Sequence, residues 1–235
     1  MNILALESSG LVASAAIVTE EKLIAEYTTN FKKTHSQTLL PMTDAILKMT
    51  GIDISEIDAV AVSGGPGSFT GLRIGSATAK GLAMVLDIPV ISVPTVDALA
   101  WNLCGSADLV CPLMDARRDQ VYTGIYEFRD GKMICLQQQE AVSILDVIGQ
   151  LNGLGRKVVF LGDGVPRFRA SLEQNLTVSF AFAPVHLAAQ RAGTLGSLAL
   201  QYYKEGRTQT AAEHHPEYLR KSQAERELEE KKHEK

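Results

Sequence analysis

The sequence is poor in cysteine, and its cysteines have no metal-binding or redox spacing. Only three of the 235 residues are cysteine, namely Cys104, Cys111 and Cys135, and no two of them form a C-x-x-C pair. An odd number of cysteines without that spacing is not typical of a disulfide framework or a zinc knuckle. The cysteine content therefore favours a reducing compartment.

Long apolar runs and an excess of basic residues are also missing. No apolar stretch is long enough to span a bilayer, and the N-terminus lacks the basic and apolar segments of a cleavable signal. The net charge of −4 argues against a broad basic surface that would bind nucleic acid autonomously. We therefore expect a cytoplasmic protein that has no membrane partner.

Histidine pairs of the kind that hold a metal on a helix are absent from the sequence. The five histidines form neither H-x-x-x-H nor H-E-x-x-H, and no G-x-S-x-G nucleophile elbow is present. His214 and His215 are adjacent, so their side chains should diverge on an extended chain. We expect no metal site, no cofactor and no Ser/His/Asp triad.

What the sequence does contain is one order of strands and helices that occurs twice. Each series predicts three strands, a helix, a strand, a helix and a strand, and the second series ends with a helix over residues 185–203. This repeat predicts an α/β fold of two related lobes with a cleft between them. The expected parts are an N-terminal lobe (1–104), a C-terminal lobe (105–205) and a tail (206–235), in which residues 216–220 dock and residues 221–235 are solvated.

A glycine-rich junction over residues 63–75 connects a predicted strand to a predicted helix. Such a junction can hold a phosphate at the helix N-terminus, or it can simply turn the chain sharply. No Lys-Ser/Thr pair follows the glycines as in a P-loop, and Thr70 stands where G-x-G-x-x-G requires its third glycine. The spacing favours a structural turn and leaves an anion site as the second interpretation.

Several residues at predicted strand ends and turns are candidate nucleotide or anion contacts. Each also has a purely structural interpretation, such as a hydrogen-bonded acid at a turn or a solvated hairpin tip with internal ion pairs. Both interpretations stay open at this point. The candidates are Glu7, Ser8, Gly65, Gly67, Arg73, Arg117 and Asp163.

Five segments of the sequence resemble the TsaB family of bacterial tRNA-modification proteins. The most specific is Ser63-Gly-Gly-Pro-Gly-Ser-Phe-Thr-Gly-Leu-Arg-Ile-Gly75. The others are Ile3-Leu-Ala-Leu-Glu-Ser-Ser9, His35-Ser-Gln-Thr-Leu-Leu-Pro41, Asp115-Ala-Arg-Arg-Asp-Gln-Val-Tyr122 and Pro216-Glu-Tyr-Leu-Arg220. Together they cover the chain nearly from end to end.

The resemblance implies an actin-like, sugar-kinase-type (ASKHA) fold and a non-catalytic subunit. Such a subunit is expected to dimerise with a catalytic TsaD-type paralogue, which transfers threonylcarbamoyl to the tRNA adenosine beside the anticodon. A TsaE-type ATPase and tRNA would join the assembly, with the tRNA contacted only indirectly. A homodimer is expected when the paralogue is absent.

The sequence differs from the catalytic TsaD-type relatives at positions that also favour a non-catalytic subunit. Those relatives hold a metal with a His-x-x-x-His pair, and the corresponding residues here are Thr95 and Leu99. Their glycine-rich turn is replaced by the bulkier residues 115–119. From TsaB itself the sequence departs at Glu7, where an aspartate is usual.

The resemblance places the partner interface on the helices predicted over residues 36–49 and 72–86. The first helix is apolar over more than one face, and the second carries a stripe of small residues at every fourth position. Two such helices from each protomer would build a four-helix interface. The candidate interface residues are Leu39, Leu40, Met42, Ile46, Leu72, Gly75, Ser76, Ala79 and Ala83.

Two enzymatic alternatives remain beside this hypothesis. One is an ATP-dependent phosphotransferase of the same fold, with Glu7, Arg73 and Asp163 around the nucleotide. The other is a metalloprotease, which the absence of paired histidines disfavours.

Overall fold

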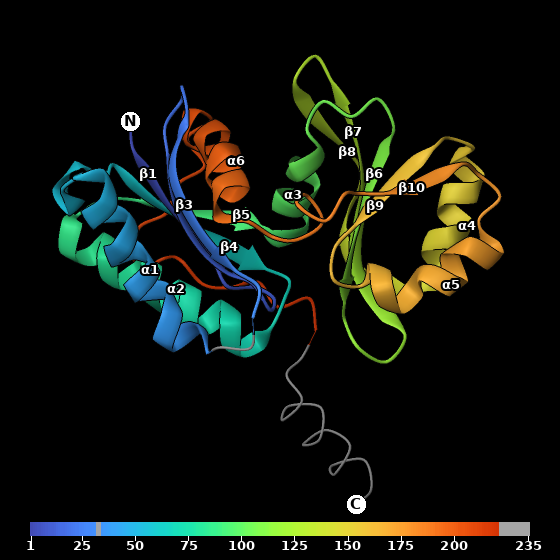
Figure 1. Cartoon of the computed structure of the whole chain (residues 1–235), viewed down its shortest axis with the longest axis horizontal. Coiled ribbons are helices and arrows are strands. Elements are labelled where there is room, and N and C mark those ends of the chain that lie inside the picture. The colour runs from blue at the N-terminus through green and yellow to red at the C-terminus, as the bar shows by residue number, and fades with distance from the viewer. Residues whose placement is uncertain (32–33, 221–235) are drawn as a thin grey trace, which may run out of the picture.

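A computed structural model describes residues 1–31 and 34–220 of the chain. Two lobes lie side by side, and each contains a five-stranded sheet flanked by helices (Figure 1). The expectation of a solvated segment over residues 221–235 lies outside the described residues. No helix in the described part of the chain is both long and apolar enough to cross a membrane.

The first lobe is built on a mixed sheet in the order β3-β2-β1-β4-β5. Its strands are β1 (Ile3–Glu7), β2 (Ala13–Val18), β3 (Leu23–Thr29), β4 (Ala59–Gly65) and β5 (Val90–Pro94). The first three strands form an antiparallel meander, and β4 and β5 continue the sheet parallel to β1. Strands β1, β2 and β4 are buried along their whole length because helices cover both faces.

The second lobe repeats this topology in the order β10-β9-β6-β7-β8. Its strands are β6 (Leu109–Asp115), β7 (Gln120–Arg129), β8 (Lys132–Ser143), β9 (Val158–Leu161) and β10 (Phe180–Phe182). Helices α4 (Ile144–Leu154) and α5 (Val165–Asn175) supply the apolar side chains that cover one face. The prediction of two related α/β lobes is thereby confirmed.

One face of the first sheet is covered by α1 (His35–Thr50) and α2 (Phe69–Leu86). The opposite face is covered by α6 (Ala192–Lys204), whose buried side chains pack with those of β1 and β2. Figure 1 shows the sheet between these two helical layers. The first lobe is therefore completed by α6, the last helix within the described residues.

This placement of α6 corrects the expectation that a helix over residues 185–203 closes the second lobe. The helix begins only at Ala192, because the backbone before it is used to join the lobes. Asn102 donates from Nδ2 to the carbonyls of Leu187 and Ala189, and the amide of Gly162 donates to Ala188 O. Those hydrogen bonds replace the local ones of a helix.

The short helix α3 (Thr95–Ala100) lies between the lobes and was not predicted. Its side chains Val96 and Leu99 pack with Val110 and Tyr126 of the second lobe. Two single-turn helices, η1 (Ile54–Glu56) and η2 (Trp101–Leu103), were also missed. Such short elements carry too little periodicity to be predicted from one sequence.

Candidate functional site

The glycine-rich junction follows β4 and forms the N-terminal turn of α2. Ser68 caps the helix by accepting a hydrogen bond from the amide of Gly71 at 3.3 Å, and its own amide donates to Ser9 O at 2.6 Å. The hydroxyl of Ser8 donates to Gly71 O at 2.9 Å. The junction is thus hydrogen-bonded to the turn between β1 and β2.

The glycines of the junction permit this close approach. A Cβ atom on Gly71 would lie 2.1 Å from Ser8 O, and one on Gly67 would lie 2.4 Å from Ser9 O. No carbon approaches an oxygen so closely, so a side chain at either position would push the turn away. Contacts within this chain therefore account for these glycines, as the structural interpretation of the junction requires.

Glu7 lies at the end of β1 and is buried beneath this junction. Its Oε1 accepts hydrogen bonds from the amide and the hydroxyl of Ser9, at 2.6 and 2.5 Å. Burial raises the pKa of Glu7, and the two bonds from Ser9 oppose that shift only in part. The acid closes a local turn beneath the junction.

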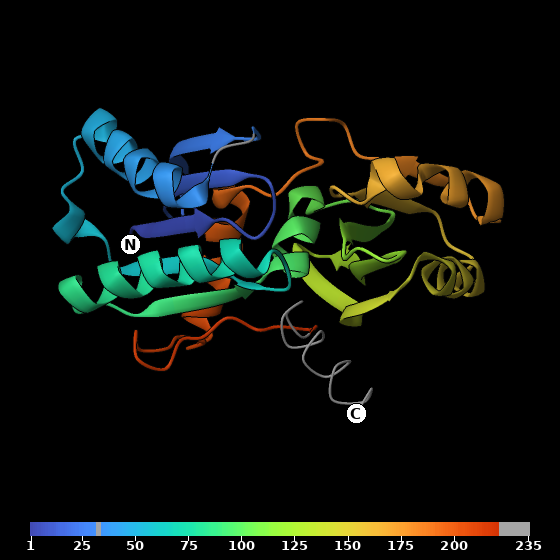
Figure 2. The same cartoon turned by 90° about the horizontal axis from the view of Figure 1, so that it is seen from below.

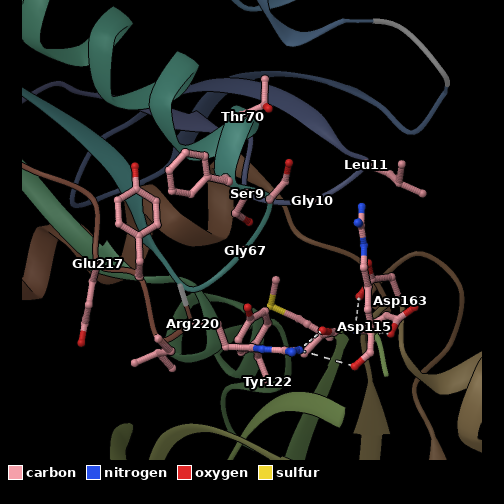
Figure 3. A pocket seen from close by; sticks show the side chains of 17 residues that line it. Ser9, Gly10, Leu11, Gly67, Thr70, Asp115, Tyr122, Asp163, Glu217 and Arg220 are labelled. Carbon is pink, nitrogen blue, oxygen red and sulfur yellow. Dashed lines mark hydrogen bonds between the residues drawn. The ribbon is translucent and has the colours of Figure 1, made fainter. Parts of the chain in front are cut away.

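A cavity of about 690 Å³ lies between the lobes, beside the junction. Its walls come from the β1–β2 turn, the start of α2, the β6–β7 turn and the C-terminal residues 217–220. Figure 3 shows Asp115 and Asp163 on one side of the cavity and Glu217 on the other. A volume of this size suits a small ligand.

The charges around the cavity are largely paired with one another. Arg167 donates from Nη1 to both oxygens of Asp115, at 2.9 and 3.1 Å, and from Nη2 to Asp119 at 3.0 Å. The carboxylate of Asp163 accepts from the amide of Asp115 at 3.2 Å, and desolvation raises its pKa. All three carboxylates therefore have hydrogen-bond partners within this chain.

The β6–β7 turn has an unusual backbone. Arg117, Arg118 and Asp119 are consecutive non-glycine residues with φ of 62°, 53° and 59°. Side chains disfavour this left-handed region, which costs roughly 1 kcal/mol or more at each residue. The turn is stabilised by the amide of Arg117 donating to Asp115 Oδ1 at 2.8 Å and by the ion pairs of Arg167. The expectation of a bulky charged turn at the cleft agrees with this arrangement.

The structure brings together only three of the seven candidate nucleotide or anion contacts. Gly67, Arg117 and Asp163 line the cavity, whereas Glu7, Ser8, Gly65 and Arg73 do not. The guanidinium of Arg73 lies over the ring of Phe69 at 4.0 Å. The three side chains assigned to a phosphotransferase, Glu7, Arg73 and Asp163, therefore do not share one cavity wall.

The sequence did not single out several residues that line the cavity. Tyr122 and Met114 come from β7 and β6, and Phe69 and Tyr218 form an aromatic wall whose ring centroids lie 4.5 Å apart. Phe69, Tyr122 and Tyr218 lie in segments that carry the family resemblance but were not among the candidate contacts, and Met114 lies outside those segments.

Eight of the nine candidate interface residues are buried inside this chain, which corrects the face on which they were expected. Leu39, Met42, Ile46, Ala79 and Ala83 belong to the core beneath α1 and α2. Leu72, Gly75 and Ser76 are buried as well, and only Leu40 is exposed, by 52%. The stripe of small residues on α2 faces its own sheet because the β1–β2 turn packs closely against it.

The exposed faces of the same two helices carry other apolar side chains. Met49 of α1 is 87% exposed, and Met84 and Val85 of α2 are 72% and 84% exposed. Gly81 and Ala77 are also exposed on α2, and a Cβ atom on Gly81 would meet open space. Scattered exposed apolar residues are ordinary on a protein surface. We call the four large exposed apolar side chains of these two helices, Leu40, Met49, Met84 and Val85, the outer apolar face.

Histidines and acids do not gather into a metal site in the part of the chain that the structure describes. His35 is hydrogen-bonded through Nε2 to Gly10 O at 2.8 Å, and His214 is buried while His215 is exposed. Thr95 and Leu99, which the resemblance led us to expect in place of the catalytic relatives' histidines, are both buried.

Comparisons with known proteins agree with this architecture. A family model described as TsaD, tRNA N6-adenosine threonylcarbamoyltransferase, matches residues 22–228. A Bacillus subtilis protein named tRNA threonylcarbamoyladenosine biosynthesis protein TsaB is 35% identical over 229 residues, which is 96% of each chain. A solved Pseudomonas aeruginosa structure, described as similar to peptidase YeaZ, has a TM-score of 0.78 at 28% identity and covers 93% of this chain and 99% of its own.

A more distant structure shares the fold alone. Component A of (R)-2-hydroxyglutaryl-CoA dehydratase from Acidaminococcus fermentans aligns with a TM-score of 0.50 at 12% identity, over 88% of this chain and 99% of that one. Two lobes of one topology around a central cavity define an α/β protein of the actin-like ASKHA class. Within that class, the chain belongs to the TsaB family.

Proposed function

We propose that this chain is a non-catalytic subunit in tRNA threonylcarbamoyladenosine biosynthesis. It binds a catalytic TsaD-type paralogue and holds it in a competent state. The observation that carries this proposal is the outer apolar face on α1 and α2, with side chains that are 52–87% exposed. Burying such residues against a partner gains about 25 cal/mol for each Å² of apolar surface removed from water.

The surroundings of Thr95 and Leu99 support the non-catalytic role. Leu99 packs in an apolar cluster with Val96, Ala100 and Tyr126. A leucine has no donor atom for a metal ion, and its packed surroundings leave no space for an imidazole. We therefore assign the transfer chemistry to the paralogue.

The same proposal covers the rest of the assembly. A TsaE-type ATPase joins the pair, and tRNA is contacted indirectly through the complex. Without the paralogue, the outer apolar face pairs with its copy on a second chain and forms a homodimer with two-fold symmetry. The net charge of −4 supports an indirect contact with tRNA.

The central test is reconstitution of tRNA modification from the catalytic paralogue, the ATPase and tRNA, with and without this chain. Modification should depend on the chain, while the chain without the paralogue should transfer nothing. Full modification in its absence would refute the proposed role.

Surface variants test the interface. Leu39→Asp or Ala79→Asp would be unsuitable because both residues are buried, so a charge there would disturb the fold instead of the pairing. Leu40→Asp and Met84→Asp should weaken binding to the paralogue by at least about ten-fold, which corresponds to about 1.4 kcal/mol. Leu145→Asp, at a 62% exposed position on α4, is the matched control and should bind normally. Equal binding by all three variants, in calorimetry, would place the interface elsewhere.

A further inference from the structure

The C-terminal residues 216–220 cross from one lobe to the other, and we call them the strap. The chain reaches the strap along the first lobe, where Gln209 and Val90 exchange backbone hydrogen bonds of 2.8 and 2.9 Å at the edge of β5. Lys80 of α2 then donates to His214 O at 2.8 Å. Figure 2 shows this red segment running along the first lobe towards the second.

The first half of the strap is bound to the first lobe. The amide of Glu217 donates to Gly64 O at 2.7 Å, at the end of β4. The ring of Tyr218 packs on Phe69 with centroids 4.5 Å apart, and Arg73 Nε donates to its hydroxyl at 3.3 Å. These contacts fix the strap to the start of α2.

The second half of the strap is bound to the second lobe. Arg220 donates from Nη1 to the carbonyl of Ala116 and, at 3.5 Å, to that of Arg117. The second lobe also contacts the first half of the strap, since Gln139 of β8 donates from Nε2 to Glu217 Oε2 at 3.4 Å, and the same nitrogen donates to Gly65 O of β4 at 3.3 Å.

Gly65 shows how closely the strap approaches the sheet. A Cβ atom at this position would lie 2.2 Å from Glu217 O, and the residue has a φ of +113°. Both the space and the conformation exclude other residues. Part of the glycine-rich junction is therefore built around the strap.

Within residues 1–31 and 34–220 the chain crosses between the lobes twice, and the strap connects them a third time. The covalent crossings are residues 95–108 after β5 and residues 183–191 after β10. Two crossings define an axis about which two packed lobes can rotate. The strap reaches a different part of the second lobe, the β6–β7 turn, and its residues 217–220 form one wall of the interlobe cavity.

We propose that the strap fixes the angle between the two lobes, and that its release lets the lobes rotate and the cavity widen. The strap is then a built-in clasp whose contacts to α2 and to the β6–β7 turn must both be intact. The clasp lies within one chain, so its action requires neither a partner protein nor tRNA modification.

The distance between spin labels on the two lobes tests the clasp. Glu21→Cys in the β2–β3 turn and Gln174→Cys on α5 are exposed labelling sites, in a chain with Cys104→Ser and Cys135→Ser. Cys111 is buried and can remain. With the strap intact, pulsed electron resonance should give one narrow distance distribution. In Tyr218→Ala/Arg220→Ala the distribution should broaden or shift by about 2 Å or more, as in domain rearrangements.

Two control variants and one further test variant complete the distance measurement. Tyr218→Phe retains the ring on Phe69 and should stay close to the parent distribution. Arg220→Ala removes only the contact to the β6–β7 turn, so it tests the clasp even if the double variant fails to fold. Tyr27→Ala, at a 49% exposed tyrosine of β3, should leave the distance unchanged. An unchanged distribution in folded Arg220→Ala would overturn the inference.

Discussion

At the scale of single residues, burial favours the neutral form of Glu7 and of His214, but the two have opposite effects on how stability changes with pH. Glu7 in the folded chain keeps its proton to a higher pH than in the unfolded chain, where its pKa is near 4.5. The folded state therefore binds more protons above that value, and the contribution to stability is lost as pH rises through the raised pKa. Removing the charge at Glu7 should relieve this loss.

Glu7→Gln is expected to unfold at a higher temperature than the parent at pH 7, with a smaller difference at pH 4. The amide oxygen can still accept the two bonds from Ser9. Glu7→Asp keeps an ionisable group and should retain the pH dependence. Thermal unfolding followed by circular dichroism between pH 4 and 8 measures this, and identical slopes for the parent and Glu7→Gln would contradict it.

His214 should make the protein less stable in acid. Burial, helped by Lys80 and His215, lowers the pKa of His214 to about 4 from 6.5. The unfolded chain then binds more protons between these values, so stability falls as pH drops from about 6.5 to about 4. A pKa lowered from 6.5 to about 4 corresponds to an upper limit of roughly 3.4 kcal/mol in the free energy of unfolding.

His214→Gln should flatten the acid limb of the stability curve in this window, measured by urea unfolding at pH 4 to 7. Its backbone carbonyl still accepts from Lys80. The exposed neighbour offers the control, since His215→Gln should leave most of the curve unchanged. A steep acid limb in His214→Gln would assign it to other groups.

At the scale of elements, two glycines of α2 show different effects: one is required by close packing, and the other only lowers the intrinsic stability of the helix. Gly71 has no room for a methyl group, because its Cβ would lie 2.1 Å from Ser8 O, whereas Gly81 faces open space. Both lie on the same helix. Gly71→Ala should destabilise the protein by about 1–3 kcal/mol through overpacking, and Gly81→Ala should stabilise it by about 0.5–1 kcal/mol. Denaturant unfolding gives both values, and a gain at both positions would refute the close contact with the β1–β2 turn.

The sequence predicted the helices of the first lobe but not which faces they bury. The periodicity around Leu39 and Ala79 is compatible with packing on the chain's own sheet or on a partner. Small residues such as Gly75 permit close packing in either case. The β1–β2 turn decides which face of α2 is buried, because a Cβ atom on Gly75 would lie only 2.4 Å from Ser8 Oγ. That is a contact between segments far apart in sequence, which the local pattern does not contain.

Only part of the candidate site could be predicted, because local sequence patterns do not contain contacts between distant segments. Asp163 and Arg117 were found because short charged or glycine-rich turns after strands are visible in sequence, and the structure places both on the cavity wall. Glu7 has the same kind of local signal, yet it lies buried beneath the junction. Tyr218 and Arg220 line the cavity only because the chain, after α6, runs along the first lobe beside β5 and then reaches the gap between the lobes.

At the scale of the whole molecule, the duplicated topology was predictable from the order of elements, whereas the path of helix α6 was not. Helix α6 comes after the second sheet in sequence but buries Leu195 and Leu198 against the first. Its apolar pattern indicates only that one face is buried. Which sheet it covers is set by residues 183–191, whose backbone bonds hold the crossing between the lobes.

This path makes the first lobe dependent on the end of the chain. Leu195, Leu198, Leu200 and Tyr202 of α6 are at most 8% exposed. At about 1.5–3 kcal/mol for each fully buried side chain, their burial is worth on the order of 10 kcal/mol. That equals the entire stability of a typical domain.

A fragment of residues 1–104 is therefore expected not to fold, although it contains every strand of the first sheet. Joining residues 191–220 to it through a Gly/Ser linker should restore a cooperative thermal transition by circular dichroism. The control joins the same segment with Leu195→Asp and Leu198→Asp, which should not restore it because a charge would then face the sheet. Cooperative unfolding of residues 1–104 alone would show that α6 is dispensable for the first lobe.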